Sequence, residues 1–205
     1  MPLQNRVLPT GEIVAIPERG TMLGNRGVLH DDARRLTPRR WAHRNWVCCV
    51  LSFKGRRRVP MTPGRYTELF FLDEAVAFAA GHRPCAECRR GDYRRWCDAW
   101  AEIDGPMSAP EMDAVLHAAR AVPGARRLRR GTARASDLPP GAFVLEGGAP
   151  LLIREADALP YAPLGYGAPR PRPRGSVEVL TPAPTLEVLR AGYRVGLHPS
   201  APPRT

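Results

Sequence analysis

Two cysteines, Cys85 and Cys88, are the residues of this chain whose type and spacing most clearly indicate chemistry. A Cys-x-x-Cys pair can place two thiolates on one metal ion. Zinc binds cysteine as thiolate and usually takes four ligands in tetrahedral geometry, so this pair supplies half of a structural zinc site. We therefore predict that Cys85 and Cys88 bind zinc and that the other ligands come from elsewhere in the chain.

Cys48 and Cys49 are the upstream candidates for the remaining positions. They are neighbours on a predicted strand over residues 45–53, and adjacent side chains of a strand point to opposite faces of the sheet. Only one of them is therefore expected to face the metal, and we prefer Cys49. The fourth ligand stays open among Cys48, His30, His43 and His82.

The five cysteines are interpreted together with the expected compartment. The N-terminus lacks the apolar segment of a signal peptide, and no run approaches the ~18 apolar residues of a membrane span. We expect a cytoplasmic protein that does not enter the membrane. In that reducing compartment, cysteines act as metal ligands, free core thiols or nucleophiles rather than as disulfides.

The charge balance indicates a polyanionic partner. There are 31 Lys and Arg against 20 Asp and Glu, a net charge of +11, and Lys54 is the only lysine. Arginine grips phosphate with two parallel hydrogen bonds and stacks on bases, which favours nucleic-acid binding. A GC-rich genome would also favour arginine over lysine, but it does not explain the net charge. The candidate phosphate contacts are Arg26, Arg56, Arg57, Arg58, Arg89 and Arg90.

Two further stretches carry basic side chains. Arginines alternate with Trp41 and His43 between residues 33 and 44, a pattern that can hold phosphates and stack on bases. A second basic run covers residues 126–130. The excess of positive charge is larger in residues 1–100, which hold 18 basic and 10 acidic residues, than in residues 101–205, which hold 13 and 10.

A candidate catalytic group lies between residues 25 and 32. His30 and Asp31, with Asp32 beside them, could hold Mg or Mn for phosphodiester hydrolysis, since hard cations prefer oxygen ligands. Asn25 lies between glycines in a predicted turn that would present its amide to a ligand. This group defines an alternative function as a metal-dependent nuclease or other nucleic-acid hydrolase, with His30 as general base or ligand.

The chain predicts an α+β fold. A small antiparallel sheet with short helices surrounds the cysteine zinc site, and a second small β-rich unit follows. Asp73 is the expected cap of a helix that ends at Gly81, and further helices are expected over 89–100, 108–121 and 185–190. Short strands are expected over 13–16, 28–29, 45–53, 66–72, 141–145, 150–153 and 176–180. We place the basic zinc-binding domain at 1–104 and the second unit, with its proline-rich tail, at 105–205.

The stretch from residue 70 to 89 resembles the second half of the zinc-binding domain of the Ada DNA-repair proteins. It contains an Ala-rich helix followed by Gly81-His82-Arg83-Pro84-Cys85-Ala86-Glu87-Cys88, where that family has Gly, an aromatic residue, Arg-Pro and Cys-x-x-Cys. The resemblance implies that Cys85 and Cys88 are zinc ligands and that the basic surroundings contact DNA rather than RNA. The family's upstream Cys-x-x-x-Cys, whose first cysteine accepts a methyl group from a DNA phosphotriester, is replaced here by Cys48-Cys49.

These patterns predict a zinc-stabilised DNA-binding protein that acts in DNA repair or processing. The nuclease described above is one alternative. A second alternative is a methyl acceptor in which a zinc-bound thiolate, Cys49 or Cys48, is the nucleophile, because zinc keeps a bound thiol deprotonated.

Overall fold

The computed structural model describes residues 1–56 and 59–203 and contains two six-stranded sheets. The first sheet is built from β1 (Arg6–Val7), β2 (Ile13–Val14), β3 (Met22–Asn25), β4 (Val47–Val50), β5 (Leu69–Phe71) and β6 (Arg83–Pro84). The second is built from β7 (Gly131–Arg134), β8 (Phe143–Glu146), β9 (Ala149–Ile153), β10 (Ala158–Ala162), β11 (Gly165–Tyr166) and β12 (Ser176–Val179).

The strands pair mainly in antiparallel fashion. The first sheet has the order β2-β1-β5-β3-β4-β6 and the second the order β11-β10-β9-β8-β12-β7. The β1–β5 and β4–β6 pairs are parallel, and the other pairs of named strands are antiparallel. The predicted fold class, α+β with small sheets and short helices, is confirmed.

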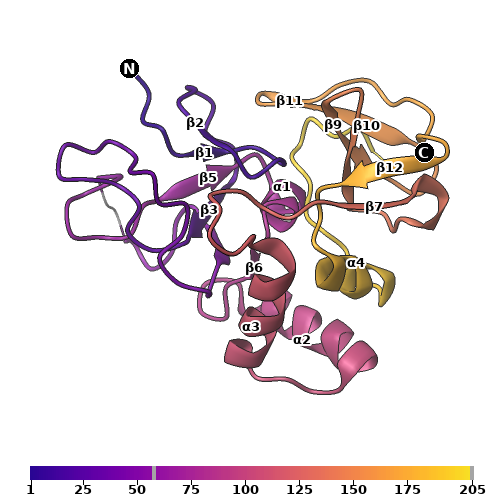
Figure 1. Ribbon diagram of the computed structural model, residues 1–205, viewed down its shortest axis with the longest axis horizontal. Coiled ribbons are helices and arrows are strands. Elements are labelled where there is room, and N and C mark those ends of the chain that lie inside the picture. Colours follow the sequence, from indigo (N-terminus) through magenta and orange to yellow (C-terminus); the bar gives the residue numbers. More distant parts are fainter. Residues whose placement is uncertain (57–58, 204–205) are drawn as a thin grey trace.

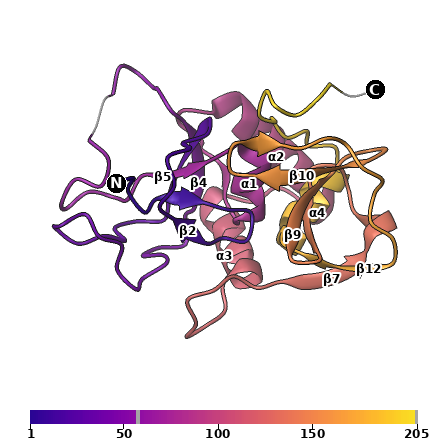
Figure 2. The ribbon, with the colours of Figure 1, turned by 90° about the horizontal axis from the view of Figure 1, so that it is seen from above.

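Four α-helices accompany the sheets in the described residues: α1 (Glu74–Ala79), α2 (Arg90–Asp104), α3 (Ala109–Arg120) and α4 (Ala183–Arg190). Figure 1 shows α1 between the two sheets, with α2, α3 and α4 along the lower edge of the molecule. Figure 2, turned by 90°, shows the same separation of the first sheet from the second. Within the described residues, no helix is both long and apolar enough to cross a membrane.

Helix α1 is buried along its whole length and joins the two sheets. Asp73 caps it as predicted, since the amide of Val76 donates to Asp73 Oδ1 at 3.0 Å. The other carboxylate oxygen, Oδ2, accepts hydrogen bonds from the Tyr166 hydroxyl at 2.8 Å and the His198 amide at 2.9 Å. One side chain therefore caps α1 and also contacts two segments of the second half of the chain.

One of the hydrophobic clusters draws on both halves of the chain and lies around α1. It contains Val7, Leu29 and Phe71 from the first half together with Phe143 and Leu152 from the second. The two sheets are therefore packed on a shared core around α1.

The prediction for residues 20–29 was wrong in one respect. The stretch 20–27 was expected to connect two strands, but it contains β3, which lies between β5 and β4 in the first sheet. Val28 and Leu29, expected to form a strand, lie outside the strands. The reason is packing at Gly24, where a Cβ would meet the ring of Phe71. A glycine in a strand marks such a close approach as well as a turn.

Candidate metal centre

Three cysteines converge at the end of the first sheet. Cys49 lies on β4, and Cys85 and Cys88 follow β6, which pairs in parallel with β4. The amide of Cys85 donates to the carbonyl of Cys48 at 3.0 Å and holds the Cys-x-x-Cys loop against that strand. The Sγ atoms of Cys49, Cys85 and Cys88, hereafter the thiol triad, all lie within 4.8 Å of one another and can hold a metal ion.

Hydrogen bonds within the triad favour one thiolate, on Cys85. Hydrogen bonds from the thiols of Cys49 and Cys88 lower the pKa of Cys85, and the backbone amides of Glu87 and Cys88 also donate to its sulfur. For Cys88, the hydrogen bond with Cys49 and the amide of Val50 lower the pKa, but the hydrogen bond with Cys85 and burial outweigh them, so its pKa is raised. The same hydrogen bonds hold a proton on Cys49 and raise its pKa. A divalent cation would replace the shared protons, because the metal ligand is the thiolate.

Cys48 is not brought to the triad. Its side chain is fully buried on the opposite face of β4, and its Sγ lies 3.6 Å from Nη1 of Arg89. Burial raises the pKa of this thiol, which keeps it protonated. The alternation of side chains along a strand explains the separation, as expected for two adjacent cysteines. Cys49 is thus the cysteine of this pair that faces Cys85 and Cys88.

The three histidines considered as the fourth ligand, His30, His43 and His82, do not join the three cysteines of the triad. His30 contacts the hydroxyl of Thr67 at 2.7 Å through Nδ1, and its Nε2 lies 3.2 Å from the carbonyl of Thr62. His82 is completely buried among Trp46, Phe71 and Arg26. His43 is half-buried, and burial lowers its pKa.

The predicted catalytic residues have separate environments. His30 is buried against Thr67, as described above. The carboxylate of Asp31 accepts hydrogen bonds from the backbone and side chain of Arg35, which lower its pKa. Asn25 lies on β3 and faces a cavity beside the triad instead. The structure therefore places Asn25 beside the thiol triad. His30 and Asp31 lie elsewhere, in contact with Thr67 and Arg35.

This cavity, hereafter the thiol cavity, has a volume of about 640 Å³ and is lined by all three triad residues. Its floor is one face of the first sheet. Cys49 lies opposite Leu23, and Leu23 lies opposite Phe70, so these side chains form a row across three strands. The cavity is also lined by Glu68, which no sequence pattern indicates because a lone glutamate next to a strand has no distinctive spacing.

The predicted phosphate contacts are divided between the interior and the surface. Arg26 is 1% exposed, and its guanidinium lies 4.3 Å from the centre of the Trp46 ring. Arg89 is also buried and pairs with Glu74 at 2.6 Å. In this structure both guanidinium groups are engaged within the protein, which differs from the expected role on phosphate. The pKa of Arg26 is lowered to about 9, mainly because its guanidinium is buried.

The remaining predicted phosphate contacts are exposed or lie outside the described residues. Arg56 is exposed and pairs with Glu87 at 2.9 Å. Arg90 is exposed at the first position of α2. Arg57 and Arg58 lie outside the described residues.

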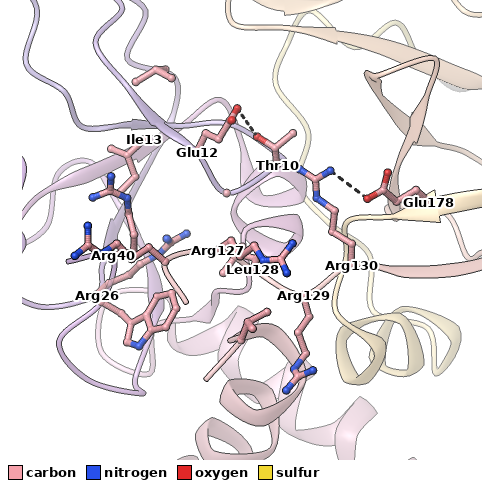
Figure 3. Close-up of a pocket in the computed structure, with 15 residues that line it drawn as sticks. Thr10, Glu12, Ile13, Arg26, Arg40, Arg127, Leu128, Arg129, Arg130 and Glu178 are labelled. Atoms are coloured by element: carbon pink, nitrogen blue, oxygen red, sulfur yellow. Dashed lines mark hydrogen bonds and ion pairs between the residues drawn. The ribbon is translucent and has the colours of Figure 1, made fainter. Parts of the chain in front are cut away.

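A groove of about 830 Å³ gathers arginines from segments that are far apart in the sequence (Figure 3). The segment 126–130 after α3 lies opposite Arg40 and the β2 region, and Glu178 of β12 lies at one end. Trp41 also lines the groove. We call this surface the arginine groove. Its six arginines are Arg26, Arg40, Arg126, Arg127, Arg129 and Arg130.

Charge in the arginine groove is predominantly positive. Its two acidic residues are Glu12 and Glu178, and Glu178 is paired with Arg130 at 3.1 Å. Arg126 and Arg127 are exposed, and Trp41 is half-buried. A second depression, lined by Arg39, Arg40, Trp41 and Arg126, continues from it. The basic surface therefore extends beyond the groove itself.

Comparison of the chain with protein-family models, with curated proteins and with solved structures finds no match. The fold and the site define an α+β protein with a three-cysteine candidate metal centre. The resemblance of residues 70–89 to the Ada zinc-binding domain stays a prediction.

Proposed function

We propose that this protein is a zinc-containing nucleic-acid-binding protein that holds the phosphate backbone in the arginine groove. The observation that carries the proposal is the convergence of five arginines that are exposed or half-buried on one surface with two acidic side chains. They are Arg40, Arg126, Arg127, Arg129 and Arg130. Phosphate contacts by arginine supply most of the sequence-independent affinity for nucleic acid.

The composition of the groove supports a partner with both phosphates and bases. Arg126 and Arg127 are exposed, so phosphates can reach their guanidinium groups from solvent. Trp41 lies on the same surface and offers part of its ring for stacking. Aromatic rings among cationic side chains are typical of surfaces that bind single strands.

Zinc is the metal that best fits the thiol triad. Three thiolates form a soft ligand set, which favours zinc over the hard cations Mg and Mn. In this role the metal fastens β4 to the segment that enters α2. The resemblance to Ada proteins favours DNA over RNA and a role in DNA repair or processing.

Binding is tested by fluorescence anisotropy with labelled single-stranded DNA, duplex DNA and single-stranded RNA at several salt concentrations. The doubly substituted Arg126→Glu, Arg127→Glu protein should bind at least tenfold more weakly, with a salt slope reduced by about 0.7–0.9 for each lost phosphate contact.

A matched control replaces two exposed arginines outside the groove, with the substitutions Arg94→Glu and Arg194→Glu. This control protein has the same net charge as the groove variant. Equal weakening in both proteins would refute a groove-specific site and leave only the general effect of charge. Metal analysis of the purified protein should give one zinc per chain.

Methyl transfer to the zinc-bound thiolate is a second candidate, favoured by the placement of Cys49 on the wall of the thiol cavity. Cys48 is fully buried and is the poorer nucleophile. Incubation with DNA that contains methyl phosphotriesters should add one methyl group to Cys49, detected by mass spectrometry of peptides. An unmodified Cys49 would exclude this activity.

A further inference from the structure

The thiol cavity differs from the surroundings of a closed structural zinc site. Among the described residues, no fourth cysteine, histidine or carboxylate joins the group defined by the triad. All three triad residues line the cavity and are partly exposed. Metal centres with three protein ligands and an open position typically bind an exchangeable ligand there.

Glu68 supplies a second, independent sign of a ligand. Its side chain lines the thiol cavity but is 97% buried, since its exposed fraction is 3%. The oxygen Oε2 accepts a hydrogen bond from the amide of Met61 at 2.8 Å. The other oxygen, Oε1, is buried and has no hydrogen-bond partner within the described structure. Such an unpaired buried acceptor is costly and calls for a donor.

Asn25 lies beside Glu68 on the floor of the cavity. The register of β3 with β5 pairs Gly24 with Leu69, and its continuation places Asn25 next to Glu68. The amide of Gly27 donates to Asn25 Oδ1 at 2.7 Å and fixes the side-chain amide. Among the described residues its amino group has no hydrogen-bond acceptor, and Asn25 lines the cavity.

The walls favour a flat, aromatic ligand. Phe53, Tyr66 and Phe70 line the cavity, and the guanidinium of Arg19 lies 5.7 Å from the centre of the Phe70 ring. A volume of about 640 Å³ lies within the range of small-molecule sites. Aromatic walls, one buried acceptor and a metal together suit a planar molecule. It would have one ring nitrogen that coordinates the metal and one N–H group that donates a hydrogen bond.

We propose that the metal held by the thiol triad keeps its fourth position open to the thiol cavity, where it binds a small planar nitrogen heterocycle. One ring nitrogen of the ligand coordinates the metal, and a ring N–H donates to Oε1 of Glu68. Nucleobases and benzimidazoles belong to this chemical class. The inference rests on the proposed zinc centre but not on nucleic-acid binding in the arginine groove, which shares no lining residue with the thiol cavity.

The test uses the full-length protein with cobalt in place of zinc, because the visible spectrum of cobalt reports its coordination. Benzimidazole should change this spectrum in a saturable manner. 1-Methylbenzimidazole keeps the coordinating nitrogen but lacks the N–H group, and it should bind about ten- to a hundredfold more weakly, as expected for loss of a hydrogen bond to a charged group.

Glu68→Gln should weaken benzimidazole by a similar factor and leave 1-methylbenzimidazole unchanged. The matched control is Glu102→Gln, which alters an exposed carboxylate of α2 outside the thiol cavity. This control should bind both probes as the unsubstituted protein does. The ligand-free cobalt spectrum and the melting temperature show whether each variant keeps its fold.

Three results would overturn the inference. An unchanged cobalt spectrum with both probes would mean that the fourth position is closed. Equal affinities for the two probes, or equal effects of the two substitutions, would remove the role of Glu68. Failure to bind cobalt or zinc at all would refute the metal centre itself, and this failure is recognised by metal analysis before any probe is added.

Discussion

Nε of Arg26 donates a hydrogen bond to Nε2 of His82 at 3.3 Å in the interior of the protein. The other ring nitrogen, Nδ1, lies 3.3 Å from the carbonyl of Ala77 and therefore carries the proton of the neutral ring. Protonation of Nε2 would place a second positive charge against the guanidinium. Burial, together with Arg26 and Arg120, holds the pKa of His82 well below its ordinary value.

This depressed pKa predicts a loss of stability in mild acid. Below about pH 6.5 the unfolded chain protonates this histidine while the folded protein does not, so the unfolded state binds more protons and the free energy of unfolding falls. The loss should reach about 2 kcal/mol between pH 7 and pH 5. Urea unfolding at a series of pH values measures it.

His82→Gln provides the control for this pH dependence. The amide does not titrate, so the variant should lose less stability between pH 7 and pH 5 even if its stability at pH 7 is lower. Other titrating groups act equally in both proteins. Parallel stability curves for the two proteins would show that His82 is not responsible.

Removal of the metal should loosen the junction between β4 and β6. The triad joins Cys49 of β4 to the loop after β6, and unfolding would release the zinc that we propose is bound there. We expect a chelator or Cys85→Ser to cost at least about 3 kcal/mol, which corresponds to about 6–12 °C in melting temperature for a chain of this size.

Cys97→Ser is the matched control for the metal prediction, because Cys97 lies on α2 and outside the triad. This variant should retain its zinc and most of its stability. A chelator should lower its melting temperature as much as it lowers that of the unsubstituted protein. Zinc loss from Cys97→Ser, or its retention in Cys85→Ser, would contradict the assigned ligands.

Asp73 should be among the most sensitive positions for stability. Its replacement by alanine removes the cap of α1 and leaves the Tyr166 hydroxyl and the His198 amide without their acceptor. We expect a loss of about 2–4 kcal/mol. Tyr166→Phe removes one of these bonds and keeps the cap, so its loss should be about 1 kcal/mol in the same urea experiment. Equal losses would show that the link to the second unit, rather than the cap, dominates.

Local patterns were sufficient to predict the parts of the fold and site that depend on neighbouring residues. The cap at Asp73, the helix that follows and the spacing of Cys85 and Cys88 are of this kind. The alternation of side chains on a strand also predicted that only one of Cys48 and Cys49 would face the other thiols.

The remaining features depend on contacts between distant segments. Arg40 and Arg127 meet in one groove because the chain after α3 passes the first sheet, which no local pattern indicates. Glu68 faces the thiol cavity because of the strand register. Arg26 lies inside the protein, where its guanidinium packs on the ring of Trp46 and donates a hydrogen bond to the carbonyl of Ala80. Its sequence neighbours, by contrast, indicated an exposed turn.

Gly24 is predicted to be essential for the close packing of β3. A methyl group at this position would meet the edge of the Phe71 ring and lie 3.4 Å from Cδ2 of His82. Gly24→Ala should therefore cost about 1–3 kcal/mol through overpacking. Gly91→Ala is the control, because Gly91 lies on α2 with only the Arg95 guanidinium near, 4.0 Å away, and alanine favours the helix by about 0.5–1 kcal/mol. Opposite shifts in the urea midpoint are expected, and a neutral Gly24→Ala would show that the ring of Phe71 can move aside.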